Sequence, residues 1–147
     1  MEKQMLEPTA LLELAAQHAY CAEHLLQENA TLLTEHKTPI DTLFPITSLL
    51  ASAFELTFKA FLLHTHGQIH PYKNLIDLMQ ANHKIGLTGQ EIRQIQQLSR
   101  SQSFRKGILY DQWESRQALH KFCIEILTLF SNLQEMIPLE LQPDYLR

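Results

Sequence analysis

The sequence predicts an all-α fold, an antiparallel bundle of four to five helices, and three observations support this. Apolar residues recur every three to four positions along several long segments. Only 4 of the 147 residues are glycine, which disfavours a turn-rich β fold. No segment has the alternating pattern of a convincing strand. We therefore expect one domain over 1–147, with the bundle over about 9–137 and an extended tail over 138–147.

The longest apolar segment runs from Ile40 to Gly67 and predicts a mostly buried helix over about 41–66. Gly67 can end this helix in a left-handed turn, because glycine carries no Cβ. Its polar stripe is narrow and contains Glu55 and Lys59, four residues apart in the order that favours an ion pair. We expect this central helix to form the core of the bundle.

Local signals mark the starts of three further helices. Pro8 is tolerated in a first turn and predicts where the first helix begins. Asn74 can cap a short helix with one apolar face. Thr88 and Glu91 have the spacing of a capping box, which predicts a helix over about 89–101.

The last predicted helix runs from about Gln112 to Ile137 and carries two apolar stripes. One stripe should pack against the central helix as its antiparallel neighbour, and four phenylalanines should then be largely buried: Phe54, Phe61, Phe122 and Phe130. The second stripe, which includes Cys123 and Leu127, indicates either a central position or a partner helix. We expect a homodimer with these two residues in or beside the interface.

Composition narrows the classes of function. The chain is 45% hydrophobic and 19% charged, with a net charge of −4. This charge argues against non-specific binding of nucleic acid, although it does not exclude a local basic patch. Cys21 and Cys123 have no metal or redox spacing, so we interpret them as reduced, buried thiols of a cytoplasmic protein. No signal core and no apolar run near 18 residues is evident, so we expect no membrane contact.

Histidines cluster at the end of the central helix, at His64, His66 and His70. Positions 64 and 66 of a helix point about 200° apart, so these imidazoles should not converge on a metal ion. Histidine is favourable near a helix C-terminus without any ligand. We predict neither a metal nor a cofactor.

Arg116 and His120 lie four residues apart on one face of the last predicted helix. Such a pair could bind a phosphate and transfer a proton. Glu114 and Glu125 compete for the two side chains. The pair is therefore one candidate catalytic constellation.

The segment SAFELTFKAFLLHTHGQIHPYKNLIDLM, residues 52–79, resembles the HEPN domain family. This family occurs in prokaryotic toxins, nucleotidyltransferase partners and defence proteins. Its second helix often carries Glu-x-x-x-Lys-Ala, then a Gly turn, a polar residue and Leu-x-x-Leu. The matching residues here are Glu55, Lys59, Ala60, Gly67, Asn74, Leu75 and Leu78. Lys73 stands where the family often has a histidine.

Many HEPN proteins are metal-independent ribonucleases that use an Arg followed, a few residues later, by a His. The resemblance places Arg105 at the arginine, Tyr110 at the histidine, and Lys106 where a smaller polar residue is usual. A phenol with a pKa of about 10 is a poor general base at pH 7, whereas imidazole titrates near neutrality. The resemblance thus implies a binding surface formed by Glu55, Lys59, Arg105, Lys106 and Tyr110. Glu55 should accept from Lys59, Arg105 or both.

Three interpretations follow. The first is a catalytically degenerate HEPN-like module that binds a protein, a nucleotide or RNA in a prokaryotic toxin–antitoxin or defence context. Its partners would be a second copy, through the last helix, and a nucleotidyltransferase or antitoxin. The second is a metal-independent endoribonuclease that uses Arg105 with Tyr110, or Arg116 with His120. The third is an unrelated helical scaffold or regulatory protein.

Overall fold

The computed structural model describes residues 7–34, 42–69, 71–102 and 116–141, with side chains described for 7–29, 42–69, 71–102 and 117–141. Its α-helices are α1 (Pro8–Thr34), α2 (Leu43–His66), α3 (Leu75–Ala81), α4 (Gly89–Ser101) and α5 (Arg116–Gln134), and its 3₁₀ turns are η1 (His83–Ile85) and η3 (Leu139–Leu141). None of these residues forms a strand. The predicted all-α bundle of four to five helices is confirmed.

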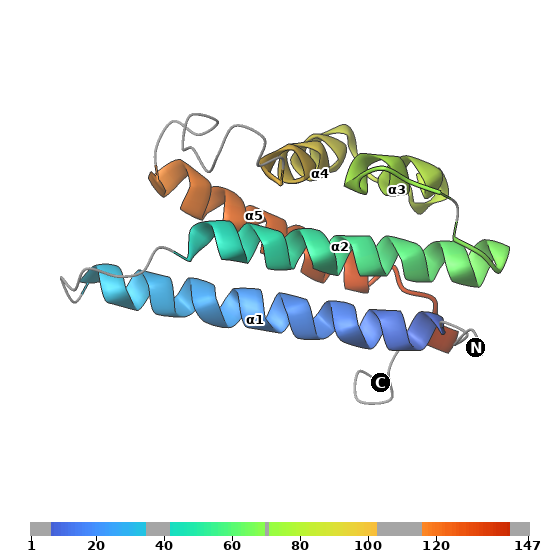
Figure 1. The fold of residues 1–147 in the computed structure, drawn as a ribbon, viewed down its shortest axis with the longest axis horizontal. Coiled ribbons are helices and arrows are strands. Elements are labelled where there is room, and N and C mark those ends of the chain that lie inside the picture. Colours follow the sequence, from blue (N-terminus) through green and yellow to red (C-terminus); the bar gives the residue numbers. More distant parts are fainter. Residues whose placement is uncertain (1–6, 35–41, 70, 103–115, 142–147) are drawn as a thin grey trace.

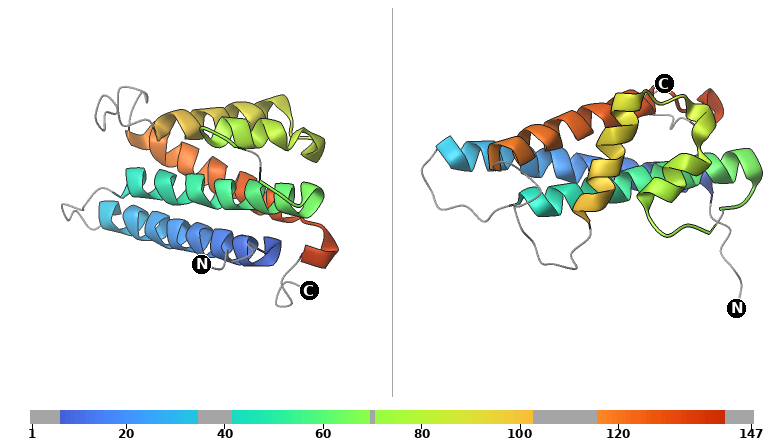
Figure 2. Two further views of the ribbon diagram at one scale, coloured as in Figure 1. Left: turned by 45° about the vertical axis from the view of Figure 1, so that its right-hand side comes forward. Right: turned by 90° about the horizontal axis from the view of Figure 1, so that it is seen from above.

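The helices form a compact bundle with α2 at its centre (Figure 1). α1 lies along one side of α2, and α5 lies behind α2 in this view. α3 and α4 cover the side of α2 opposite α1, where α4 crosses over α2 and α5 (Figure 2). α2 is therefore the one helix in extensive contact with each of the other four.

α2 is central because its apolar residues cover most of its circumference. Phe54 and Phe58 are fully buried, and the Phe54 ring meets the Phe130 ring edge-on, with centroids 5.5 Å apart. Phe61 and Phe122 are also buried, so the four predicted core phenylalanines are confirmed. Edge-to-face pairs add to the free energy of burial.

By length and composition, α2 could span a membrane, although no membrane contact was expected from the sequence. It is the only helix of this kind among the described residues. More than half of its most apolar window is buried inside the bundle. This burial is typical of the core helix of a soluble protein.

α1 approaches α2 closely through small residues. Ala15, Ala19 and Ala22 are all buried on one stripe of α1, beside Leu12 and Leu26. Small side chains allow helix axes to approach, which lengthens the interface. The contact between α1 and α2 is the most extensive of any helix pair.

Three of the predicted helix ends, at Gly67, Asn74 and Thr88, are confirmed. Gly67 has a φ of +72° and its N–H donates to the Leu63 carbonyl, 2.9 Å away, which closes α2. The Asn74 side chain accepts from Asp77 N at the start of α3. Both hydrogen bonds of the capping box between Thr88 and Glu91 are present at the start of α4.

The prediction that α2 and the last helix are antiparallel is wrong, because the two run in the same direction (Figure 1). Gln102, after α4, accepts from Ser48 at 3.0 Å and donates to Thr47 at 3.3 Å. α3 and α4 thus carry the chain back to the beginning of α2 before α5 starts. α5 then follows α2, so Phe54 meets Phe130 and both C-terminal ends border one pocket.

Three smaller expectations also differ from the structure. α5 ends at Gln134, and the tail is not extended throughout, since η3 turns back and buries Leu141. Cys21 is exposed rather than buried. Cys123, by contrast, is fully buried, as predicted for a core thiol, and its place in or beside a dimer interface stays a prediction. Residues 112–115, the expected start of the last helix, lie outside the described residues.

Candidate functional site

Glu55 lies at the centre of a small polar cluster on α2, formed with Lys59 and Tyr72. Lys59 Nζ is 3.4 Å from Glu55 Oε1, so the predicted ion pair is confirmed. The Tyr72 hydroxyl donates to the same oxygen at 2.5 Å. Lys59 Nζ also lies 4.9 Å from the centroid of the Tyr72 ring, a cation–π geometry. Through these contacts the loop around Tyr72 is fixed to α2.

The surroundings of the Glu55 cluster shift two pKa values upward. Burial and the hydrogen bond to Glu55 raise the pKa of Tyr72 above its ordinary value of 10.0. Burial by itself would lower the pKa of Lys59, but the contacts with Tyr72 and Glu55 outweigh it and raise that pKa above 10.5. At neutral pH, Lys59 is therefore a cation and Tyr72 is a neutral phenol that donates.

We expect Tyr72 to ionise at a higher pH than an ordinary tyrosine, because its pKa is raised. Its pKa is higher in the folded than in the unfolded chain, so its contribution to stability is complete below pH 10. That contribution is lost as the pH rises through the raised value. In a titration followed by tyrosinate absorbance, Tyr72→Phe should remove a component that ionises above the ordinary tyrosine range. If the tyrosinate absorbance of Tyr72→Phe at high pH rises as it does in the unaltered protein, the described contacts of Tyr72 are contradicted.

A polar groove of about 550 Å³ adjoins this cluster. α2 contributes Glu55, the segment before α3 contributes Tyr72, Lys73 and Asn74, and the end of α4 contributes Arg100. We call it the Arg100 groove. It is formed where α4 ends against α2, so its two sides come from segments far apart in the sequence.

The Arg100 groove carries an excess of positive charge. Lys73 and Arg100 are exposed, and neither side chain forms an ion pair with any described residue. Glu55, the one acidic residue among the described residues that line the groove, is paired with Lys59 and Tyr72. The nearby Asp77 carboxylate accepts from the backbone N–H of Lys73, with Lys73 N 3.0 Å from Asp77 Oδ2. A guanidinium and an ammonium at such a groove suit an anionic oxygen ligand.

Three other residues predicted for the binding surface lie outside the described part of the chain. Arg105, Lys106 and Tyr110 lie within 103–115, outside the described residues, so their proximity to Glu55 stays a prediction. Gln102, the last described residue before them, lines the Arg100 groove.

The alternative pair, Arg116 and His120, lies on α5 as predicted. The Arg116 side chain is outside the described part of the structure, so its contact with His120 is untested. His120 Nε2 is buried and has no hydrogen-bond partner among the described atoms. His120 does not line the Arg100 groove.

The histidines at the end of α2 do not assemble into a metal site in the described part of the chain. No group of three or more His, Cys, Asp or Glu side chains there could hold a metal ion. His64 instead pairs with Glu140, with Nε2 and Oε1 3.2 Å apart. His70 lies outside the described residues.

Comparison of the chain with protein-family models, curated proteins and solved structures finds no match. The resemblance to the HEPN family therefore rests on the motif residues alone, and it stays a prediction.

Proposed function

We propose that the chain is a non-catalytic, HEPN-like helical module that binds single-stranded RNA through the Arg100 groove. The observation that carries this proposal is the groove's two cations, Lys73 and Arg100. Neither forms an ion pair with a described residue, and Glu55, the one carboxylate among the described lining residues, is already paired. The resemblance to HEPN proteins adds a prokaryotic toxin–antitoxin or defence context. It also suggests a nucleotidyltransferase or antitoxin as protein partner. The cytoplasmic location is proposed from the expectation that Cys21 and Cys123 are reduced.

The contacts available in the groove suit a nucleic-acid strand. Arg100 and Lys73 can each bind a phosphate oxygen, which gives affinity without sequence preference. Asn74 uses its Oδ1 to cap α3, so its amide N–H groups can donate to a sugar or base. Two phosphate contacts imply weak binding that falls as salt is added.

The absence of catalysis is supported by the chemistry of the described groups. A general base needs a pKa near the working pH. The Tyr72 phenol has a raised pKa and donates to Glu55, while the Glu55 carboxylate is occupied by Tyr72 and Lys59. Neither group is placed to remove a proton from a 2′-hydroxyl.

Fluorescence anisotropy with a labelled single-stranded RNA, at low and at physiological salt, tests this proposal. We expect saturable binding that weakens with salt and weakens further in Arg100→Ala. Arg93→Ala is the matched control, since Arg93 is an exposed arginine of α4 that does not line the groove. Equal losses in both variants would indicate only a general effect of charge.

A metal-independent endoribonuclease is the second candidate, favoured by one observation. His120 Nε2 is buried without a partner in the described part of the chain, four residues after Arg116. A buried imidazole nitrogen with no partner is uncommon unless a ligand or a missing group satisfies it. Arg105 with Tyr110 is the other pair that this candidate could use. The unrelated-scaffold alternative would predict neither binding nor cleavage of RNA.

The homodimer is proposed to form through the outer faces of α5 and α1. Ile124 is 46% exposed, and a groove beside it is lined by Leu127 of α5 and Tyr20 of α1. Tyr20 is itself 70% exposed. An apolar face of this kind is typical of an interaction surface.

We expect multi-angle light scattering to give a mass of about twice 17.1 kDa at high micromolar concentration. Ile124→Glu should shift that mass toward the monomer, because burying an unpaired carboxylate is costly. Arg93→Glu, a charge reversal at an exposed residue of α4, should leave the dimer intact. A monomer mass for the unaltered protein at that concentration would contradict the proposal.

A further inference from the structure

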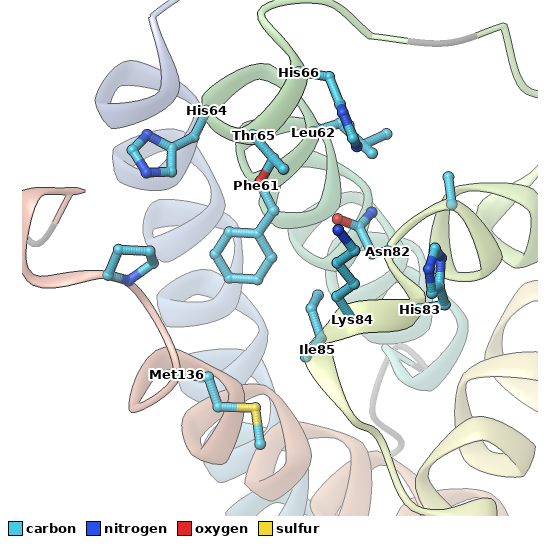
Figure 3. A pocket seen from close by; sticks show the side chains of 12 residues that line it. Phe61, Leu62, His64, Thr65, His66, Asn82, His83, Lys84, Ile85 and Met136 are labelled. Carbon is cyan, nitrogen blue, oxygen red and sulfur yellow. The ribbon is translucent and has the colours of Figure 1, made fainter.

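A second cavity, of about 410 Å³, lies at the C-terminal end of α2 and is separate from the Arg100 groove. Its walls come from the last turns of α2, from η1 and the residue before it, and from the segment that follows α5. Figure 3 shows the Phe61 ring pointing into this space, with Ile85 and Met136 below it. Small-molecule sites typically have volumes of about 300–1,000 Å³ and apolar walls.

The rim of this cavity is basic. Lys84 of η1 lines it and makes no ion pair with any described residue. The imidazoles of His64, His66 and His83 line it as well, and none of the described lining residues is acidic. Glu140 lies close by but is engaged by His64 at 3.2 Å.

One feature of the fold, the negative end of the α2 helix dipole, opposes the binding of an anion in this cavity. Its partial charge must be compared with the positive charge at the rim. The C-terminus of a helix carries a partial negative charge of about half an elementary charge, and α2 ends at this cavity. The Gly67 N–H already satisfies the Leu63 carbonyl of that last turn. Lys84 supplies a full positive charge, so the mouth of the cavity favours an anion.

The turn that carries the basic residues is held in place before any ligand arrives. Asn82, the residue before η1, is buried, and its Nδ2 donates to the Leu78 carbonyl at 2.8 Å and to the Phe58 carbonyl at 3.3 Å. These bonds tie the start of η1 to both α3 and α2. A preformed site avoids the cost of ordering the loop on binding.

From these observations we propose that this cavity binds a small amphipathic carboxylate, a molecule with an apolar body and one carboxylate group. The apolar body would pack against Phe61, Ile85 and Met136, and the carboxylate would accept from Lys84 at the rim. This inference does not depend on the RNA-binding proposal, because the two sites share no lining residue.

Isothermal titration calorimetry with three probes of equal chain length tests the proposal: decanoate, decanol and decyltrimethylammonium, each below its micelle concentration. We expect one decanoate per chain and an affinity for decanol that is lower by about tenfold or more, the usual loss when a charged hydrogen bond is missing. The cationic probe should not bind. Equal affinity for decanoate and decanol would overturn the proposal, since the cavity would then select only an apolar chain.

Substitutions of Lys84 at the cavity rim test where the carboxylate of bound decanoate lies. Lys84→Gln should weaken decanoate binding about tenfold, while Lys84→Arg should retain it. Lys121→Gln, which removes a lysine elsewhere on the surface, should have no effect. Unchanged decanoate affinity in Lys84→Gln would refute the assigned role.

An observation on the unaltered protein places the apolar body without relying on any variant. Met136 lines the cavity, so its methyl resonance in an NMR titration should shift in proportion to the decanoate bound. A Met136 methyl signal that does not move at saturation would show that decanoate binds elsewhere.

Discussion

Replacing Phe54 with alanine is expected to reduce the free energy of unfolding by about 3–5 kcal/mol, the usual cost of deleting a buried aromatic ring. Phe54 is fully buried on α2 and contacts the rings of Phe58 and Phe130. Its loss would leave a cavity between α2 and α5, where the well-packed core can collapse only in part. Urea denaturation followed by circular dichroism measures this effect.

Phe122→Ala should fall in the same range, because Phe122 is buried on α5. Arg93→Ala is the control: Arg93 is exposed on α4, so its truncation should change stability by less than about 0.5 kcal/mol. A loss below about 1 kcal/mol for Phe54→Ala would mean that the core is assigned to the wrong face of α2.

Reversing both free charges of the Arg100 groove, Lys73→Glu with Arg100→Glu, is expected to weaken RNA binding on the order of 100-fold at low salt. Each variant removes a charge-assisted hydrogen bond of about 1.5–3 kcal/mol, equivalent to roughly a factor of ten or more. Each also places a carboxylate near a phosphate. Both side chains are exposed and make no described ion pair, so the fold should tolerate the change.

The matched control is Arg93→Glu with Lys121→Glu. Both double variants change the net charge of −4 by the same amount, and both alter exposed side chains. Neither Arg93 nor Lys121 lines the groove. Similar weakening in the two double variants would show that RNA responds to overall charge and not to this groove.

Features that depend on neighbouring residues could be predicted from the sequence. The caps at Gly67, Asn74 and Thr88 are set by side chains and backbone within one turn, and each is present as expected. The ion pair between Glu55 and Lys59 follows from helical spacing in the same way. The exposure of Cys21 could also have been found, because Gln17 and His24, on the same face of α1, are polar.

Features that depend on distant residues could not be predicted. The direction of α5 is set by α3 and α4, which return the chain to Ser48 through Gln102, 54 positions later in the sequence. Tyr72 meets Glu55 from a loop 17 residues away, with no periodic signal. The Arg100 groove requires α4 to end against α2, so sequence spacing gave no indication that Arg100 lies beside the Glu55 cluster.

The central claim, that the protein binds single-stranded RNA and does not cleave it, is tested most directly by following one labelled RNA in metal-free buffer. After incubation with excess protein, half of each sample is run on a native gel and half on a denaturing gel. The account predicts an RNA that is shifted on the native gel and intact on the denaturing gel. Cleavage that is abolished by Arg105→Ala, or an RNA that is never shifted, would contradict it.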